Sequence, residues 1–481
     1  MSKAERHYDR ANRLFEKGRF RDALREFNLA IEIDPHEPDF YNDRGLVWDK
    51  LGIAERALED FTAAIDLNPT APAYFFNRAR IFSLINEPER AGDDLTEVLH
   101  LDPFDSEALL LRGGVLADQM KWDEAIEDYN SAIDLTPDNP DLFYDRGLAW
   151  EGKKEYHKAI DDFTQALAFD PDYVPAVMDR GNCWDELGEL ENALEDYSRA
   201  LELAPNDPMI LFNRGLAWLN SGKIDEAIED FGNSLKFEPD NRRALSSRGD
   251  AWMKKGDREK ALADYAAAIE LDPDDGDLYY RRGNLWDELG KSENALADYN
   301  LAVRLEPQQF GAWHNRGNLW FERGEYQKAL EDYSKAIELD PKMVIAYRNR
   351  GDTLRSLGKP ELALADFNHA LELDPDNHES HNCRGGLFLE LGQLQKSLAD
   401  YDCAVNLDPS CPVCLKARGE VYWRLGQYDE AIKDFTASIA IDPQDSESYA
   451  MRAEAYEQIG QAQFAEADRV KTLELRARLK P

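Results

Sequence analysis

Two histidines and two cysteines come closest, by type and spacing, to a chemical site. His378 and His381 are three residues apart, and Cys411 and Cys414 follow in the sequence Cys-Pro-Val-Cys. Two ligands of each type are what a structural zinc site uses, and a Cys-X-X-Cys pair can also be redox-active. Equivalent points on neighbouring packed helices are about 10 Å apart, which strains a four-ligand site. We therefore favour a purely structural role for these residues over a metal site or redox chemistry.

The sequence contains no short motif that carries catalysis or phosphate binding. There is no Walker loop, no G-x-S-x-G and no H-E-x-x-H, and the eight histidines are scattered. Residues 272–277 superficially resemble a calcium loop, but the spacing of the glycine and of the final glutamate does not fit. We therefore predict a protein that is not an enzyme and that needs no cofactor.

The composition is strongly acidic. Aspartate and glutamate outnumber lysine and arginine 96 to 57 over 481 residues, so the formal net charge is −39. Binders of nucleic acids and anionic membranes need an excess of basic residues, and neither class of partner is expected here. No apolar run approaches the roughly 18 residues of a membrane span, and the N-terminal stretch lacks the apolar segment of a secretion signal. With only five cysteines, these features predict a soluble, cytoplasmic chain in a reducing compartment.

A repeat of constant length runs from one end of the chain to the other. Thirteen prolines recur at equal intervals, beginning with Pro35, Pro69 and Pro103 and ending with Pro443, without insertion or deletion. Numbering each repeat from 1 to 34 places this proline at position 32, so that the first repeat starts at Ala4 and a fourteenth starts at Ser446. Such a period is typical of solenoids, in which each repeat buries its apolar side against its neighbours.

Within each repeat, small and large residues alternate as two packed helices require. Position 8 is Gly or Ala throughout, and positions 20 and 27 are mostly Ala, whereas positions 4, 11 and 24 are mostly large and apolar or aromatic. Position 15 is Gly in eleven repeats, where a helix ends and the chain needs a positive φ. The three exceptions, Asn86, Met120 and Lys154, predict either a locally different turn or simple tolerance. Each repeat is therefore predicted to be a helical hairpin.

This pattern resembles the tetratricopeptide repeat family over essentially residues 4–477. The resemblance implies an all-α fold, a right-handed α-solenoid in which the first helix of each hairpin lines a concave groove. We expect thirteen tandem repeats over residues 4–445 and a degenerate fourteenth repeat with a capping helix over residues 446–481. The cap is expected because Arg469, Thr472 and Ala477 replace the usual residues at positions 24, 27 and 32. A terminal repeat needs a polar outer face.

One departure from the family pattern recurs in every repeat. Position 7 is Arg throughout, and position 23 is Glu in the first repeat and Asp in the other thirteen. Two independent surface charges would vary between repeats, so we expect these residues to pair across the hairpin, where a guanidinium can make two parallel hydrogen bonds to one carboxylate. Arg44 with Asp60, and Arg316 with Asp332, are examples of this predicted structural pair.

The resemblance also implies how the groove would hold a peptide. In peptide-binding relatives, Asn at position 9 and Asn at position 6 of the next repeat grip the peptide backbone, which offers a donor and an acceptor to an amide. This pairing occurs three times here: Asn182 with Asn213, Asn284 with Asn315, and Asn318 with Asn349.

The groove is expected to carry different charges in different repeats. Around the last two asparagine pairs lie the basic residues Arg281, His314, Arg348 and Arg355, which favour an acidic or C-terminal segment in repeats nine to eleven. Repeats two to six carry an acidic wall, which favours either a basic segment or solubility alone. The wall consists of Asp39, Asp43, Asp49, Asp141, Asp145, Glu151, Asp179, Asp185 and Glu186.

These expectations combine into a non-enzymatic adaptor or scaffold that binds extended protein segments or partner domains. Two alternatives remain open. One is a co-chaperone whose repeats nine to eleven clamp acidic C-terminal tails, although His314 and Glu379 stand where the clamp would have lysines. The other is a targeting module for a separately encoded enzyme.

Overall fold

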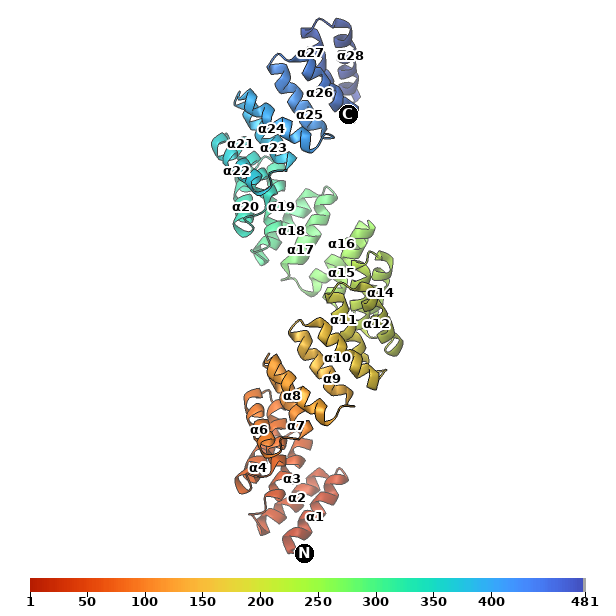
Figure 1. Cartoon of the computed structure of the whole chain (residues 1–481), viewed down its shortest axis with the longest axis vertical. Coiled ribbons are helices and arrows are strands. Elements are labelled where there is room, and N and C mark those ends of the chain that lie inside the picture. The colour runs from red at the N-terminus through yellow and green to blue at the C-terminus, as the bar shows by residue number, and fades with distance from the viewer. Residues whose placement is uncertain (479–481) are drawn as a thin grey trace. The chain divides into compact units, whose positions relative to one another are not determined.

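The structure, a computed structural model, describes residues 1–478, and these form 28 α-helices. Figure 1 shows them as successive antiparallel hairpins. No strand occurs among the described residues, and the prediction of an all-α solenoid of fourteen hairpins is confirmed. None of these helices combines the length and the apolar character needed to cross a membrane.

The first helix of each repeat occupies approximately positions 1–13. These helices are α1 (Lys3–Glu16), α3 (Pro38–Lys50), α5 (Pro72–Leu84), α7 (Ser106–Asp118), α9 (Pro140–Gly152), α11 (Val174–Glu186), α13 (Pro208–Asn220), α15 (Arg242–Lys255), α17 (Gly276–Glu288), α19 (Phe310–Glu322), α21 (Val344–Ser356), α23 (His378–Glu390), α25 (Pro412–Arg424) and α27 (Ser446–Gln458).

The second helix occupies approximately positions 17–30. These helices are α2 (Phe20–Ile33), α4 (Ala54–Leu67), α6 (Pro88–Leu101), α8 (Trp122–Leu135), α10 (Tyr156–Phe169), α12 (Leu190–Leu203), α14 (Ile224–Phe237), α16 (Arg258–Leu271), α18 (Ser292–Leu305), α20 (Tyr326–Leu339), α22 (Pro360–Leu373), α24 (Leu394–Leu407), α26 (Tyr428–Ile441) and α28 (Ala462–Arg478).

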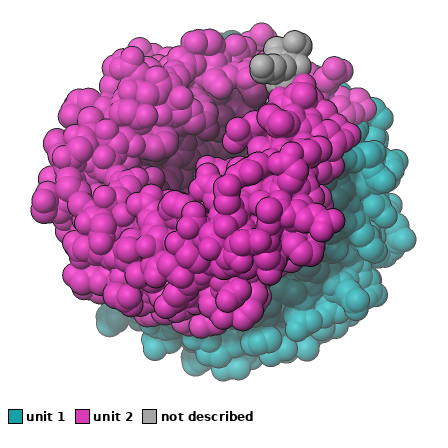
Figure 2. Space-filling view, turned by 90° about the horizontal axis from the view of Figure 1, so that it is seen from above, with its two compact units in different colours: residues 1–256 teal, residues 257–481 magenta. Residues whose placement is uncertain are grey.

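The chain forms two compact units, residues 1–256 and 257–481, which Figure 2 colours separately. The boundary lies inside the eighth repeat, between α15 and α16. In the view of Figure 2 the second unit is hollowed at its centre. Such a hollow is what a concave groove lined by the first helices would produce.

Glycine at position 8 makes room for an aromatic ring at position 24. A Cβ atom added to Gly113 would lie 2.6 Å from Cε1 of Tyr129, and one added to Gly45, Gly147 or Gly351 would lie equally close to a phenylalanine ring. The third repeat has Ala79 at position 8, and there the ring is replaced by Leu95. The close approach of the two helices is therefore set by the pair of residues at positions 8 and 24.

The turn between the two helices has the same backbone conformation in all fourteen repeats. The eleven glycines at position 15 have positive φ, and so do Asn86, Met120 and Lys154, with φ of 60°, 58° and 61°. The expectation of a locally different turn is wrong, because the hairpin geometry holds these residues in the left-handed region regardless of their side chains.

Replacing Met120 with glycine is expected to stabilise the chain by about 1 kcal/mol, because the left-handed region costs a residue with a Cβ about that much. The Met120 side chain is 76% exposed, so little packing is lost. Hydrogen exchange over α7 and α8 would measure the gain. Met209, also exposed but inside α13, is the control, and Met209→Gly should destabilise the chain. A loss of stability in Met120→Gly would contradict the argument.

The last repeat differs from the others as expected, but its outer face is not uniformly polar. Its second helix, α28, buries Ala465, Thr472 and Leu475 against α27 and leaves Val470 and Leu473 more than half exposed. The expectation of a polar cap is therefore wrong for these two residues. Residues 479–481 of the range expected for this repeat and its capping helix lie outside the described residues.

Candidate protein-binding surface

Paired arginine and aspartate side chains join the two helices of most hairpins. Arg316 Nε donates to Asp332 Oδ2 at 2.7 Å, and Arg316 Nη2 donates to Asp332 Oδ1 at 2.7 Å. Arg44 and Asp60 make the same two bonds at 2.8 and 2.6 Å. Both partners are largely withdrawn from water, with Arg316 14% and Asp332 5% exposed. The first repeat is looser, since Arg10 is 70% exposed and lies 3.3 Å from Glu26.

The same arginines also reach the preceding repeat. Arg316 Nη1 donates to Asn300 Oδ1 at 2.8 Å, and Arg44 Nη1 donates to Asn28 Oδ1 at 2.7 Å. In several other repeats the acceptor at this place, position 25, is Thr, Ser or Asp, as with Arg78 and Thr62. In all these repeats the arginine therefore bonds its own hairpin and the one before it. The small polar residue at position 25 recurs in the sequence and could have predicted this third hydrogen bond of the position-7 arginine.

The predicted asparagine pairs bond to each other across neighbouring repeats. Asn213 Nδ2 donates to Asn182 Oδ1 at 3.0 Å, and Tyr197 from the same repeat as Asn182 donates its hydroxyl to that oxygen at 2.8 Å. We call this arrangement an amide rung. In the Asn182–Asn213 rung, the bonds within the rung leave the carboxamide oxygen of Asn213 and one amide hydrogen of each asparagine for a partner.

The second compact unit contains two such rungs. Asn315 Nδ2 donates to Asn284 Oδ1 at 2.9 Å, and Asn349 Nδ2 donates to Asn318 Oδ1 at 3.0 Å. The Asn318–Asn349 rung opens into a pocket of about 360 Å³ that Tyr333, Phe321 and Ile345 also line. An amide pair in a partly apolar pocket can bind a peptide backbone and cover its side chains.

Five carboxyl groups on α9 and α11 are near enough to influence one another. Burial and the neighbouring Asp141 raise the pKa of Asp145 to about 6. Burial, Asp179 and Glu186 raise the pKa of Glu151 to about 7. Burial also raises the pKa of Asp179, although Tyr144 and Asn182 donate hydrogen bonds to it at 2.8 and 3.1 Å.

The remaining wall residues extend this acidic surface. Burial and Glu186 raise the pKa of Asp185, whose neighbour Glu186 lies 3.5 Å from the hydroxyl of Tyr156. Asp141 accepts a hydrogen bond from Tyr173 at 3.0 Å. Asp49 on α3 differs, because Arg80 lies 3.5 Å away. Within the described part of the chain, no lysine or arginine is among the groups that shift the carboxyl pKas of α9 and α11.

The basic residues of repeats nine to eleven are already paired with acids of the same chain. Arg281 donates to Asp277 at 2.5 Å, and Arg348 forms an ion pair with Glu379 in the next repeat. Arg355 lies 3.5 Å from Asp352 and 3.8 Å from Glu390. The expected cationic surface for an acidic segment is therefore largely neutralised.

His314 does not add a positive charge to this region. Burial lowers its pKa, and the neighbouring Arg348 lowers it further, while a hydrogen bond to Asn315 opposes the change. Its two ring nitrogens lie 3.1 Å from Asn315 Oδ1 and 3.2 Å from Asn349 Nδ2. A neutral ring fits these contacts, and His314 serves to link the two amide rungs.

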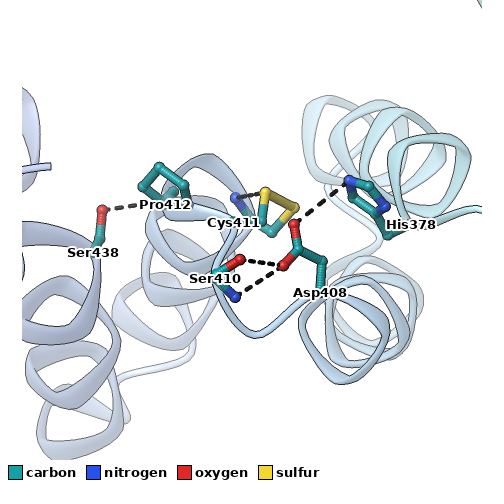
Figure 3. Close-up of a disulfide and its surroundings, with 7 residues drawn as sticks. His378, Asp408, Ser410, Cys411, Pro412 and Ser438 are labelled. Carbon is teal, nitrogen blue, oxygen red and sulfur yellow. Dashed lines mark hydrogen bonds and ion pairs between the residues drawn. A yellow bond between two sulfur atoms is a disulfide. The ribbon is translucent and has the colours of Figure 1, made fainter. Parts of the chain in front are cut away.

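The histidines and cysteines weighed as a zinc set do not converge. The sulfur atoms of Cys411 and Cys414 form a disulfide (Figure 3). His378 faces Asp408 at 3.8 Å, and His381 lies 3.1 Å from Asp400. Among the described residues, no group of three or more His, Cys, Asp or Glu could hold a metal ion. The disulfide also weakens the argument for a reducing compartment that rested on the number of cysteines.

Family models match most of this architecture. The matching models are described as tetratricopeptide repeat or TPR repeat, and the ranges they match together exceed half of the chain. These ranges are 8–72, 113–153, 186–222, 208–241, 249–286, 276–309, 311–343, 344–377, 367–399 and 412–445. The chain belongs to the tetratricopeptide repeat family. Proteins of this family act in protein–protein interactions, and this tetratricopeptide repeat chain is an interaction scaffold in that general sense.

Several solved tetratricopeptide repeat structures are similar. A tetratricopeptide repeat protein from Parabacteroides merdae is 21% identical, with coverage of 52% of this chain and 98% of that one and a TM-score of 0.42. The APC/C hetero-tetramer Cut9-Hcn1 is 14% identical, with coverage of 95% and 96% and a TM-score of 0.44. YrrB, described as a TPR protein with an unusual peptide-binding site, is 24% identical, with coverage of 38% and 95% and a TM-score of 0.33. No curated protein matches the sequence significantly.

Proposed function

We propose that the surface formed by α9, α11 and α13 binds a basic, extended protein segment. The observation that carries this proposal is the group of part-buried carboxyls on α9 and α11, whose pKas are raised by burial and by one another, with no lysine or arginine among the causes of these shifts. Part-buried carboxylates without a counter-ion are costly, so a lysine or arginine from a partner would relieve that cost on binding. A surface kept only for solubility would leave its charges in water, where their pKas stay near the ordinary values.

The adjacent amide rung supplies the second element of recognition. Asn182 joins the two, because its Nδ2 donates to Asp179 and its Oδ1 accepts from Asn213. An extended peptide offers a backbone N–H and C=O at each residue, which the rung can bind without regard to sequence. The carboxyl groups would then select basic side chains on that peptide.

Fluorescence anisotropy with the full chain tests the proposal. The probes are a labelled peptide of alternating serine and lysine and the matching serine–glutamate peptide. Only the basic peptide should bind, and its affinity should fall steeply as salt is raised. The double variant Glu151→Gln/Asp179→Asn should bind about tenfold more weakly, a loss of about 1.4 kcal/mol.

A matched control uses two exposed acids on α12. Glu191→Gln/Glu195→Gln removes the same two negative charges from the chain as a whole. Equal weakening in this control would show that only net charge matters. Failure of the basic peptide to bind would favour the solubility explanation.

Binding should also release protons near pH 6.5. The folded chain keeps protons on Asp145 and Glu151 at pH values where the unfolded chain has lost them, so their contribution to stability falls as pH rises from about 4 to 7. A bound cation favours the ionised forms, so the protons leave on binding and affinity falls as pH drops from 7.5 to 5.5. Calorimetry in buffers of different ionisation enthalpy measures this release, and Asp145→Asn/Glu151→Gln should abolish it. Affinity independent of pH would contradict the assignment.

The geometry does not favour the clamp for acidic tails. The guanidinium of Arg348 is engaged by Glu379, and His314 is neutral, so the cations that would hold two carboxylates are not available. The two amide rungs of the second unit are better suited to backbone contacts along an extended segment. A role as the targeting module of a separate enzyme depends on the partner and stays a prediction.

A further inference from the structure

A disulfide joins the first residues of α25. Cys411 is the N-cap residue of this helix and Cys414 lies in its first turn, and their sulfur atoms are bonded (Figure 3). Both residues belong to the same turn, so the bond links neither two helices nor two repeats. Closing so short a loop restricts the unfolded chain less than a long-range crosslink does. This disulfide is therefore expected to contribute little to the stability of the solenoid.

The two sulfur atoms have unequal access to solvent. Cys411 is half-buried at the start of the helix, whereas Cys414 is 1% exposed and packs with Ala404, Val405 and Leu415. An incoming thiol can therefore reach Cys411 but not Cys414. Cys411 can therefore be attacked by a thiol, whereas Cys414 is the protected leaving group that can re-form the disulfide.

The start of α25 stabilises negative charge on Cys411. The backbone N–H of Cys414 donates to Cys411 Sγ at 3.2 Å. Helix N-termini favour anions, and cysteines placed there form thiolates more readily.

The nearby carboxylate of Asp408 would disfavour a thiolate at Cys411, but hydrogen bonds partly offset its charge. Asp408 accepts hydrogen bonds from the backbone N–H and the hydroxyl of Ser410 at 2.9 and 2.6 Å. On its other side His378 Nε2 lies 3.8 Å from its carboxylate, as Figure 3 shows. The hydrogen bonds from Ser410, and to a smaller extent His378, lower the pKa of Asp408, and these donors offset part of its negative charge.

We propose that Cys411 and Cys414 form a redox-active pair that exchanges with low-molecular-weight thiols and protein dithiols. In reduction, a thiolate of the reductant attacks Cys411 Sγ, the bond between the two cysteines breaks, and Cys414 leaves as a thiolate and takes up a proton. A second thiolate of the reductant then attacks the mixed disulfide at the sulfur atom that came from the first reductant thiol. This step releases the disulfide of the reductant and the Cys411 thiolate. Overall, two thiols are oxidised to one disulfide, and the pair gains two electrons and two protons.

A glutathione titration of the full chain tests this reaction. The chain is equilibrated in buffers with varied ratios of reduced to oxidised glutathione, quenched by alkylation, and the bridged fraction is measured by peptide mass spectrometry. We expect a reversible transition between bridged and reduced forms within the range of these buffers. A pair that stays bridged, or stays reduced, in every buffer would overturn the proposal.

A trapping variant tests the unequal roles of the two cysteines. Cys414→Ala should keep the fold, since Ala108, Ala176 and Ala244 occupy the same repeat position and are fully buried. With oxidised glutathione this variant should form a mixed disulfide at Cys411. The reaction should be at least tenfold faster than at Cys403, an exposed lone thiol within α24 that serves as the internal control.

The reverse variant completes the test. Cys411→Asn places at the N-cap the residue that Asn241 and Asn377 provide in other repeats, so folding should be kept. No glutathione adduct is expected on Cys414 in this variant. An adduct there at the same rate, or equal rates at Cys411 and Cys403 in the trapping variant, would show that the helix start does not control reactivity.

Discussion

Arg316→Ala is expected to lower the free energy of unfolding by about 3–5 kcal/mol, since removing one partner of a buried ion pair leaves an uncompensated charge. Asp332 would keep its burial, which already raises its pKa, and would lose both hydrogen bonds from Arg316. Asn300 in the preceding repeat would lose its donor as well. Urea denaturation and hydrogen exchange over α19 and α20 would measure the loss.

The pH dependence separates this mechanism from simple loss of packing. In Arg316→Ala the carboxyl group of Asp332 has a raised pKa in the folded chain, so the folded form takes up a proton as pH falls. The difference in the free energy of unfolding between the variant and the parent chain should therefore become smaller as the pH is lowered from 7 to 4.5. Arg10→Ala is the control, because Arg10 is mostly exposed and should contribute less than about 1 kcal/mol. Equal losses in both variants would contradict the role of burial.

Gly113→Ala is expected to destabilise the chain by about 1–3 kcal/mol, because the added methyl group would overlap the ring of Tyr129. The neighbouring Gly114 provides a matched control on the same helix. A Cβ there meets only the Tyr129 hydroxyl at 4.0 Å, so Gly114→Ala should stabilise α7 by up to about 1 kcal/mol. Two adjacent, chemically identical changes should thus have opposite signs in thermal or chemical denaturation.

A rescue experiment tests the cause of that loss. The third repeat pairs Ala79 with Leu95, and the same combination can be built as Gly113→Ala/Tyr129→Leu. The double variant should be more stable than the sum of the two single changes predicts, which is the signature of direct contact. The first repeat combines Ala11 at position 8 with Phe27 at position 24, so a helix pair can accommodate both an alanine and a ring. A similar shift of α7 would place the loss for Gly113→Ala at the lower end of its expected range. Additive losses would exclude the steric explanation.

The constant period of the repeat was enough to predict the hairpins and their pairs. Small residues at position 8 and charges of opposite sign at positions 7 and 23 recur in every repeat, and a recurring pair has to satisfy the same local geometry each time. This is why the contact between Arg316 and Asp332 could be predicted, together with the helix that carries each residue.

Contacts made only once along the chain could not be predicted in the same way. Arg348 and Glu379 belong to consecutive repeats and each could point in several directions, so their pairing depends on side-chain conformations that no repeat pattern fixes. The disulfide was likewise open, since the spacing of Cys411 and Cys414 fitted a metal, a redox pair or neither. The raised pKas on α9 and α11 depend on burial as well as on charge, and the sequence reveals only the charge.

The third hydrogen bond of the position-7 arginine has a consequence for how the chain comes apart. The eighth repeat has Ala266 at position 25, and alanine offers no side-chain acceptor. Arg282 in the ninth repeat makes its two bonds to Asp298. In a linear array of repeats, each interface between neighbouring repeats contributes separately to stability. Heat or tension should therefore separate the eighth and ninth repeats more readily than repeats whose arginine also bonds the preceding hairpin.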